Sequence, residues 1–113
     1  MELNELTAHE LLDKLKDKQV SSSAILDALN RRIQTVEPKV KAYVRFKPGN
    51  EPSFNLRPQG LLPGLPITIK DNICTEGLNT ECCSKILNNF RPPYDATVIN
   101  KLKQAGAEIF PLK

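Results

Sequence analysis

The fold is decided by one stretch of sequence, LPGLPITIKDN, at residues 62–72. A Pro-Gly turn leads into an uncharged, β-branched run that ends at Lys70, so we expect residues 67–70 to form a strand, buried on both faces if the sheet is parallel or mixed. Lysines in water are protonated near neutral pH, whereas a lysine drawn towards a packed interior loses hydration and becomes a candidate proton acceptor. Lys70 is therefore the candidate catalytic residue. The alternative is a strand-end lysine that simply reaches back to water.

Two further segments follow this stretch and, like it, contain turn-forming residues. TECCSKIL occupies residues 80–87, and NFRPPYDATVINKLKQAGAEI occupies residues 89–109. Together with GLPITIKDNICTEG at residues 64–77, they resemble the amidase signature family. Within that family, the spacing and the PPYDATV run are most similar to the N-terminal part of glutamyl-tRNA(Gln) amidotransferase A subunits, including organellar forms.

The resemblance implies a serine-dependent hydrolase of amides in which a lysine is the ultimate base of a Ser-Ser-Lys relay. It places Lys70 at the family's lysine position. The two serines of the relay belong to a glycine- and serine-rich segment further along, and the 113 residues contain no such segment. We therefore expect an N-terminal portion of an amidase that supplies the relay lysine and is inactive alone.

The same resemblance sets the expected partners and cofactors. The partners are other amidotransferase subunits or the remainder of the A subunit, in a system that releases ammonia from glutamine to form Gln-tRNA. ATP and magnesium are expected only in partner subunits, and no cofactor is expected on this chain. In particular, Gly60 and Gly64 are too few and wrongly spaced for a phosphate-binding loop.

A second hypothesis makes the chain a non-catalytic interaction or assembly module derived from the same family, with Lys70 as a structural relic. Two predicted strands are too few for an independent sheet, so unpaired apolar edges are expected. Such edges require a covering partner, or the fold is marginal. The two hypotheses differ in whether activity in an assembled enzyme depends on Lys70.

Length, composition and charge exclude several other classes. Of the 113 residues, 40% are hydrophobic and 26% are charged, which is neither the apolar deficit of a disordered chain nor the excess of a membrane protein. The formal net charge of +3 is spread along the chain, so direct nucleic-acid binding is not expected. No signal peptide or membrane-spanning run is evident. We expect a cytoplasmic protein, with a mitochondrial or plastid matrix as the alternative.

The sequence predicts an α/β fold: an N-terminal helical hairpin plus a partial mixed sheet with a β-α-β crossover, as an incomplete amidase signature fold. Thr7 and Glu10 form a capping box that opens a helix over residues 8–18. Serines at 21–23 open a second helix, antiparallel to the first, which Pro38 should end. The expected buried faces of the two helices are Ala8, Leu11, Leu12 and Leu15, and Ile25, Ala28, Leu29, Ile33 and Val36.

The domain organisation follows from a change in composition in the middle of the chain. Residues 1–46 hold the helical hairpin and a first strand, which alternating side chains predict at residues 42–46. Residues 47–60 are a polar, Pro-rich linker, and residues 61–113 begin the amidase signature core.

The last part of the core should be a helix followed by a strand. Asp95 is the expected N-cap of a helix over residues 96–105, with Val98 and Ile99 on its buried face and Gly106 as its left-handed C-terminal residue. Residues 108–110 should form a strand, parallel to the earlier one and joined to it by a right-handed crossover.

The remaining polar residues have ordinary interpretations. Ser84 and Thr80 could present hydroxyls to Lys70 as a Ser-Lys dyad, but capping a short helix at residues 84–87 is the more common use of such hydroxyls. Asp71 and Asn72 are expected to form a turn after the strand.

The cysteines and the single histidine complete the candidates. Cys74, Cys82 and Cys83 are expected to be reduced, because the adjacent pair cannot readily bridge across a trans peptide. We expect Cys74 and Cys83 to pack as small apolar residues. His9 should be a surface residue of the first helix, because no ligand or nucleophile is near it in the sequence.

Overall fold

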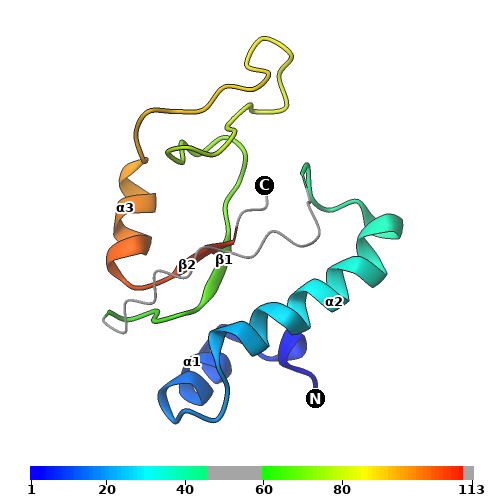
Figure 1. Ribbon diagram of the computed structural model, residues 1–113, viewed down its shortest axis with the longest axis vertical. Helices are drawn as coiled ribbons and strands as arrows, with labels where there is room; N and C mark the ends of the chain where they lie inside the picture. The colour runs from blue at the N-terminus through cyan, green and yellow to red at the C-terminus, as the bar shows by residue number, and fades with distance from the viewer. Residues whose placement is uncertain (46–59, 111–113) are drawn as a thin grey trace.

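A computed structural model describes residues 1–45 and 60–110 of the chain. Helices η1, α1 and α2 lie at one end of the molecule, the loops of residues 70–96 lie at the other, and the two strands lie between them (Figure 1). The elements in chain order are the 3-10 helix η1 (Leu3–Glu5), α1 (Ala8–Lys16), α2 (Ser22–Val40), β1 (Pro66–Thr68), α3 (Thr97–Gln104) and β2 (Glu108–Phe110).

The predicted capping box at the start of α1 is confirmed. The Thr7 hydroxyl accepts the Glu10 N–H at 3.3 Å, and the Glu10 carboxylate accepts the Thr7 N–H at 2.8 Å. This hydrogen bond from the Thr7 backbone is the main reason why the pKa of Glu10 lies below its ordinary value. The helix ends two residues earlier than expected, because Lys18 adopts a left-handed φ of 56°.

The start of α2 is as predicted, but its end is not. Ser21 caps the helix by accepting the Ala24 N–H at 3.2 Å. The helix continues past Pro38, which lies inside its last turn. A proline at this position removes one backbone hydrogen bond of the helix. The last turn still closes, because the Lys41 N–H donates to the Glu37 carbonyl, and Lys41 has a left-handed φ of 51°.

The core consists of two clusters on different faces of α2. Leu11, Ile25 and Leu65 form the first cluster, and Leu26 packs with Phe110 in the second. The first cluster is completed by partly buried side chains, namely Leu3, Leu6, Leu12, Leu15, Val20, Leu29 and Leu62. Helix α2 therefore packs against both the N-terminal segment and the sheet.

The helical faces were predicted well but not completely. Ala8 is exposed, and Leu26, which the expected face omitted, is buried. The reason is that α2 contacts β2 as well as the hairpin, so its buried stripe is wider than one helical face. The antiparallel orientation of α1 and α2 stays a prediction.

The sheet consists, within residues 1–45 and 60–110, of β1 and β2 in parallel, with Ile67 opposite Ile109. The bounds predicted for β2 and the parallel pairing are confirmed. Strand β1 covers Pro66–Thr68, so it begins one residue before and ends two residues before the predicted residues 67–70. It ends there because Thr68 pairs with Phe110, the last described residue of β2. Contrary to expectation, β1 is not buried on both faces, since Thr68 is exposed. Parallel strands joined through α3 form a crossover, whose handedness stays a prediction.

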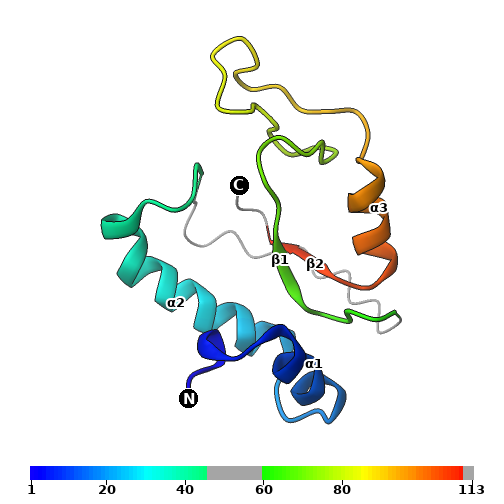
Figure 2. The ribbon, with the colours of Figure 1, turned by 180° about the vertical axis from the view of Figure 1, so that it is seen from behind.

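Helix α3 lies beside β2, on the side of the sheet away from α2 (Figure 2). Asp95 is not its side-chain cap, contrary to the prediction. Its carboxylate is engaged elsewhere: Oδ1 accepts the Glu76 N–H at 2.7 Å, and Oδ2 pairs with Lys103 at 2.6 Å. Ile99 is fully buried as expected, whereas Val98 is exposed. Gly106 has the predicted left-handed φ of 84°.

The predicted first strand at residues 42–46 is absent from the part that the structure describes, because residues 41–45 have no regular secondary structure. Its last residue and most of the predicted linker at residues 47–60 lie outside the described residues. None of the helices in residues 1–45 and 60–110 has the length and apolar character needed to cross a bilayer.

Candidate active site

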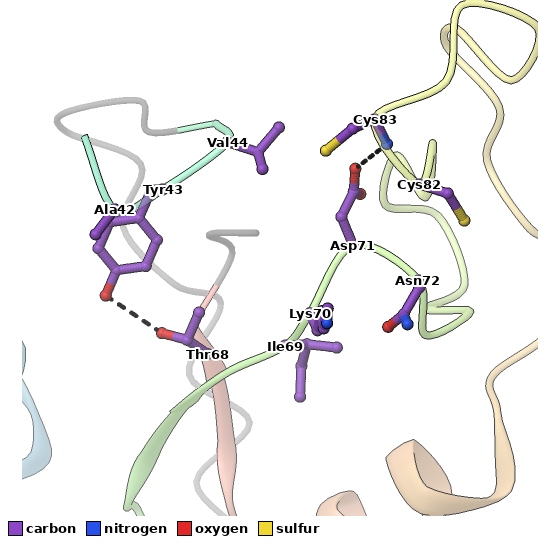
Figure 3. A pocket seen from close by; sticks show the side chains of 10 residues that line it. All are labelled: Ala42, Tyr43, Val44, Thr68, Ile69, Lys70, Asp71, Asn72, Cys82 and Cys83. Carbon is purple, nitrogen blue, oxygen red and sulfur yellow. Dashed lines mark hydrogen bonds between the residues drawn. The ribbon is translucent and has the colours of Figure 1, made fainter.

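Lys70 lies two residues beyond the last residue of β1, at the wall of a hollow of about 700 Å³. The hollow lies between the segment that follows α2 and the loops that follow β1 (Figure 3). Its lining residues are Ala42, Tyr43, Val44, Thr68, Ile69, Lys70, Asp71, Asn72, Cys82 and Cys83. In open α/β sheets, ligands bind outside the carboxyl ends of the strands, which is where this hollow lies.

The surroundings of Lys70 differ from the sequence expectation. Of the two expectations, a lysine withdrawn into a packed interior and a strand-end lysine that reaches back to water, the structure fits the second, because Lys70 is exposed, between the buried residues Ile69 and Asp71. Among residues 1–45 and 60–110, its ammonium group has neither a hydrogen-bond partner nor an ion-pair partner. The Lys70 side chain thus lies at the hollow without a partner among the described residues.

Asp71 is more than the turn residue that the sequence suggested. It is 5% exposed, and its carboxylate forms an ion pair with Arg45. The Glu81 N–H donates to its Oδ1 and the Cys83 N–H to its Oδ2, each at 3.3 Å. Its own carbonyl accepts the Cys82 N–H at 3.1 Å. Residues 81–83 therefore wrap around the side chain of Asp71.

Arg45 extends this network across the hollow. Its guanidinium contacts Asp71, forms a second ion pair with Glu81 at 3.1 Å and donates to the Asn79 carbonyl at 3.0 Å. The Asn79 side chain in turn donates to Glu81 and accepts from Arg91. Sequence reasoning missed these residues, because Arg45 and Asp71 are 26 positions apart. The one available signal was the charged residue directly after Lys70.

The cysteines lie partly as expected. All three have free thiols, as predicted. Cys74 is partly buried, with its sulfur 3.6 Å from the Tyr94 hydroxyl, and a hydrogen bond to the sulfur that favours the neutral phenol raises the pKa of Tyr94. Cys83, expected to pack in the interior, is exposed, because Cys82 and Cys83 adopt left-handed φ angles of 50° and 55° as the loop turns around Asp71.

The structure does not bring the two candidate hydroxyls to Lys70. Neither Ser84 nor Thr80 lines the hollow. Thr80 is buried, and its hydroxyl donates to the Leu78 carbonyl at 3.3 Å. The short helix expected at residues 84–87 is a series of turns. A dyad of Lys70 with Ser84 or Thr80 is therefore not supported.

His9 and possible metal sites lie outside this arrangement. His9 is an exposed residue of α1, as predicted, with Nε2 3.9 Å from the Asp13 carboxylate. No group of three or more His, Cys, Asp or Glu side chains in the described residues is arranged to hold a metal ion.

Comparison with known proteins identifies the family. The family model described as Amidase matches residues 24–111. The chain belongs to the amidase family. It is 50% identical over 107 residues to the A subunit of glutamyl-tRNA(Gln) amidotransferase from Halothermothrix orenii, covering 94% of this chain and 22% of that protein. It is 47% identical over 116 residues to the same subunit from Heliobacterium modesticaldum, covering 95% of this chain and 24% of the relative.

Two solved structures share the fold of this chain. The crystal structure of the A subunit of glutamyl-tRNA(Gln) amidotransferase from Thermotoga maritima matches with a TM-score of 0.72 and 32% identity, covering 98% of this chain and 23% of that one. An inhibitor-bound complex connected with the origins of an s-triazine catabolic enzyme matches with a TM-score of 0.75 at 19% identity, covering 92% of this chain and 25% of that chain, and it shows the fold alone. The chain thus corresponds to about a quarter of its relatives, at their N-terminal end.

Proposed function

We propose that this chain is the N-terminal segment of the A subunit of a glutamyl-tRNA(Gln) amidotransferase, and that Lys70 is the base of a Ser-Ser-Lys relay that hydrolyses the amide of glutamine. The observation that carries the proposal is the position of Lys70. It stands at a hollow beyond the end of β1, and its side-chain nitrogen has no partner among residues 1–45 and 60–110. The identity to A subunits of this enzyme supports the substrate class.

In the proposed reaction, the neutral amine of Lys70 takes the proton of one serine hydroxyl, and that serine takes the proton of the second serine. The second serine oxygen attacks the amide carbon, the C–N bond breaks, and ammonia leaves with the proton returned through the relay. Water then hydrolyses the acyl-serine ester to glutamate. The serines come from the glycine- and serine-rich segment, which the 113 residues do not contain, so these residues alone have no amidase activity.

The partners follow from the same proposal. The remainder of the A subunit supplies the serines, and other amidotransferase subunits use ATP and magnesium to amidate glutamate carried on tRNA. No cofactor is assigned to this chain, and nucleic acid is contacted through the partners. The proposed location is the cytoplasm, or the matrix of a mitochondrion or plastid.

A chimera tests the proposal. In the A subunit from Halothermothrix orenii, the region that aligns with this chain is replaced by these 113 residues, and the chimera is purified with its partner subunits. We expect it to release ammonia from glutamine, and we expect Lys70→Ala to lower the rate about 10²- to 10⁴-fold. Lys101→Ala is the matched control, since Lys101 is an exposed lysine of α3 that does not line the hollow.

The same experiment separates this proposal from the assembly-module hypothesis. If the segment contributes only contacts, Lys70→Ala should assemble and hydrolyse glutamine at the rate of the Lys101→Ala control. A thermal melt of each chimera establishes that the compared proteins are folded. Hydrolysis of glutamine by the isolated 113 residues would contradict the proposed division of the relay.

A further inference from the structure

Asp71 is connected to two separate parts of the chain, the segment after α2 and the loop of residues 81–83, although it directly follows Lys70. Arg45 approaches from the segment after α2, and the N–H groups of Glu81 and Cys83 approach from a loop ten to twelve residues further on. The Asp71 carbonyl also accepts the Cys82 N–H. With 5% of its surface exposed, Asp71 is among the most firmly held residues around the hollow.

Lys70 has no comparable support of its own. Its side chain is exposed and has no partner atom in residues 1–45 or 60–110. A lysine side chain is a flexible four-carbon stem, so the place of its amine depends on where the backbone starts it. Consecutive Cα atoms are fixed about 3.8 Å apart. The contacts that immobilise Asp71 therefore also fix the backbone from which Lys70 extends.

The backbone of Lys70 is restrained on its other sides as well. Its carbonyl accepts the Ile73 N–H at 3.1 Å, and the preceding Ile69 is 4% exposed. These contacts hold the chain direction at Lys70, but neither of them reaches across the hollow. The Asp71 and Arg45 pair joins the two walls of the hollow, since residues 42–44 lie on one wall and Cys82 and Cys83 on the other.

We propose that Asp71, held by Arg45, is the positioning residue for Lys70. The proposal rests on the proposed function, in which Lys70 is the relay base. Asp71 does not take part in the proton transfer. It fixes the backbone of Lys70 and the loop of residues 81–83, so that the amine of Lys70 enters the hollow in one place.

Asp71→Asn is the informative substitution. It keeps the size of the side chain, but an amide has one acceptor oxygen and one donor nitrogen. The Arg45 guanidinium and the N–H groups of Glu81 and Cys83 are all donors. The amide nitrogen must therefore face at least one of these donors, so at least one of the hydrogen bonds to residue 71 is lost. Arg45 keeps its ion pair with Glu81.

Asp95 provides a matched control. Its side chain is 8% exposed, and like Asp71 it accepts a backbone N–H, from Glu76, and forms an ion pair, with Lys103. It does not line the hollow. Asp95→Asn therefore removes the same kinds of interaction at a site that cannot position Lys70.

The test measures kcat and KM for glutamine hydrolysis by the chimera with its partner subunits. We expect Asp71→Asn to lower kcat about 100-fold, as for a displaced catalytic group, with KM changed by less than about twofold. We expect Asp95→Asn to lower Tm by a similar amount but to leave kcat within about twofold of the unsubstituted chimera. Hydrogen exchange at the amides of Glu81 and Cys83 should become faster in Asp71→Asn only.

The outcomes are separable from those of the proposed function. The positioning role is overturned, and the role of Lys70 stands, if Lys70→Ala is inactive while Asp71→Asn and Asp95→Asn both keep kcat. The same conclusion follows if Asp71→Asn raises only KM. If Lys70→Ala is active, the proposed function itself fails. If Asp71→Asn does not assemble, Arg45→Lys tests the positioning role instead. Lysine keeps the positive charge but lacks the planar guanidinium with its fixed donors, and we expect kcat to fall about tenfold. An unchanged kcat in Arg45→Lys would then overturn the role.

Discussion

The Ser22 hydroxyl donates a 2.8 Å hydrogen bond to the carbonyl oxygen of Gly64, 42 residues away. The bond is buried, and it joins the first turn of α2 to the Pro-Gly turn that leads into β1. The helical hairpin is thereby attached to the strand that carries the candidate site. The close approach of the Ser22 hydroxyl also explains why a glycine occupies position 64, where the backbone has a φ of +73°.

Gly64→Ala should destabilise the chain. A methyl group at this position would lie 2.1 Å from the Ser22 hydroxyl oxygen, and the left-handed backbone is unfavourable for alanine. We expect a loss of about 2–3 kcal/mol in the free energy of unfolding, measured by denaturant titration. Gly77→Ala is the control, because Gly77 has a similar φ of +76° but an open surrounding. Equal losses in the two variants would show that contact with Ser22 is unimportant.

Ile25 should be the most sensitive position of the first core cluster. Its side chain, on α2, is fully buried and packs in one cluster with Leu11 of α1 and with Leu65. Ile25→Ala removes apolar contacts and leaves a cavity, at a cost of about 2–5 kcal/mol. Val40→Ala, at the exposed end of the same helix, should change stability by less than about 0.5 kcal/mol. Thermal unfolding of both variants checks the difference, and a mild effect at Ile25 would mean that this cluster is not the core.

Glu108 should make the stability of the chain depend on pH. Burial raises the pKa of the Glu108 carboxyl above its ordinary value. A raised pKa means that the folded chain binds the proton more tightly, so this contribution is complete below the ordinary pKa and is lost as pH rises through the raised one. Relative to the unsubstituted chain, Glu108→Gln should therefore gain stability as pH rises above the ordinary glutamate pKa of about 4.3. A difference that stays constant as pH rises would contradict this prediction.

Asp95 should act in the opposite direction. Burial alone would raise the pKa of Asp95, but the hydrogen bonds from Lys103 and from the Glu76 N–H, together with the lysine charge, hold it below its ordinary value. Its stabilising contribution is present above the ordinary pKa and is lost as pH falls through the lowered one. Asp95→Asn should therefore flatten the acid limb of the curve of unfolding free energy against pH. A curve of unchanged shape would show that the pair with Lys103 contributes nothing.

Local signals in the sequence predicted local structure. The caps at Thr7 and Ser21, the left-handed Gly106 and strand β2 all depend on residues within a few positions of one another, and the structure confirms them. The predicted end of α2 was wrong, because the turn that contains Pro38 still closes through the hydrogen bond from the Lys41 N–H to the Glu37 carbonyl.

Contacts between distant residues could not be predicted in this way. The network around Asp71 and the wider buried stripe of α2 with Leu26 both depend on pairs that the fold brings together. The exposed position of Lys70 is of the same kind, because it depends on which distant segments the fold places around the hollow. Motif resemblance indicated Lys70 as the candidate residue, and only the structure shows which contacts hold its neighbours.

The most direct test of the central claim is the rate of ammonia release from glutamine by the Lys70→Ala chimera, measured with and without added methylamine. A proton acceptor of this kind contributes about 10²- to 10⁴-fold to the rate. We predict a loss in this range, with partial recovery that grows with the concentration of the free amine. A Lys70→Ala rate equal to that of the unsubstituted chimera would contradict the account.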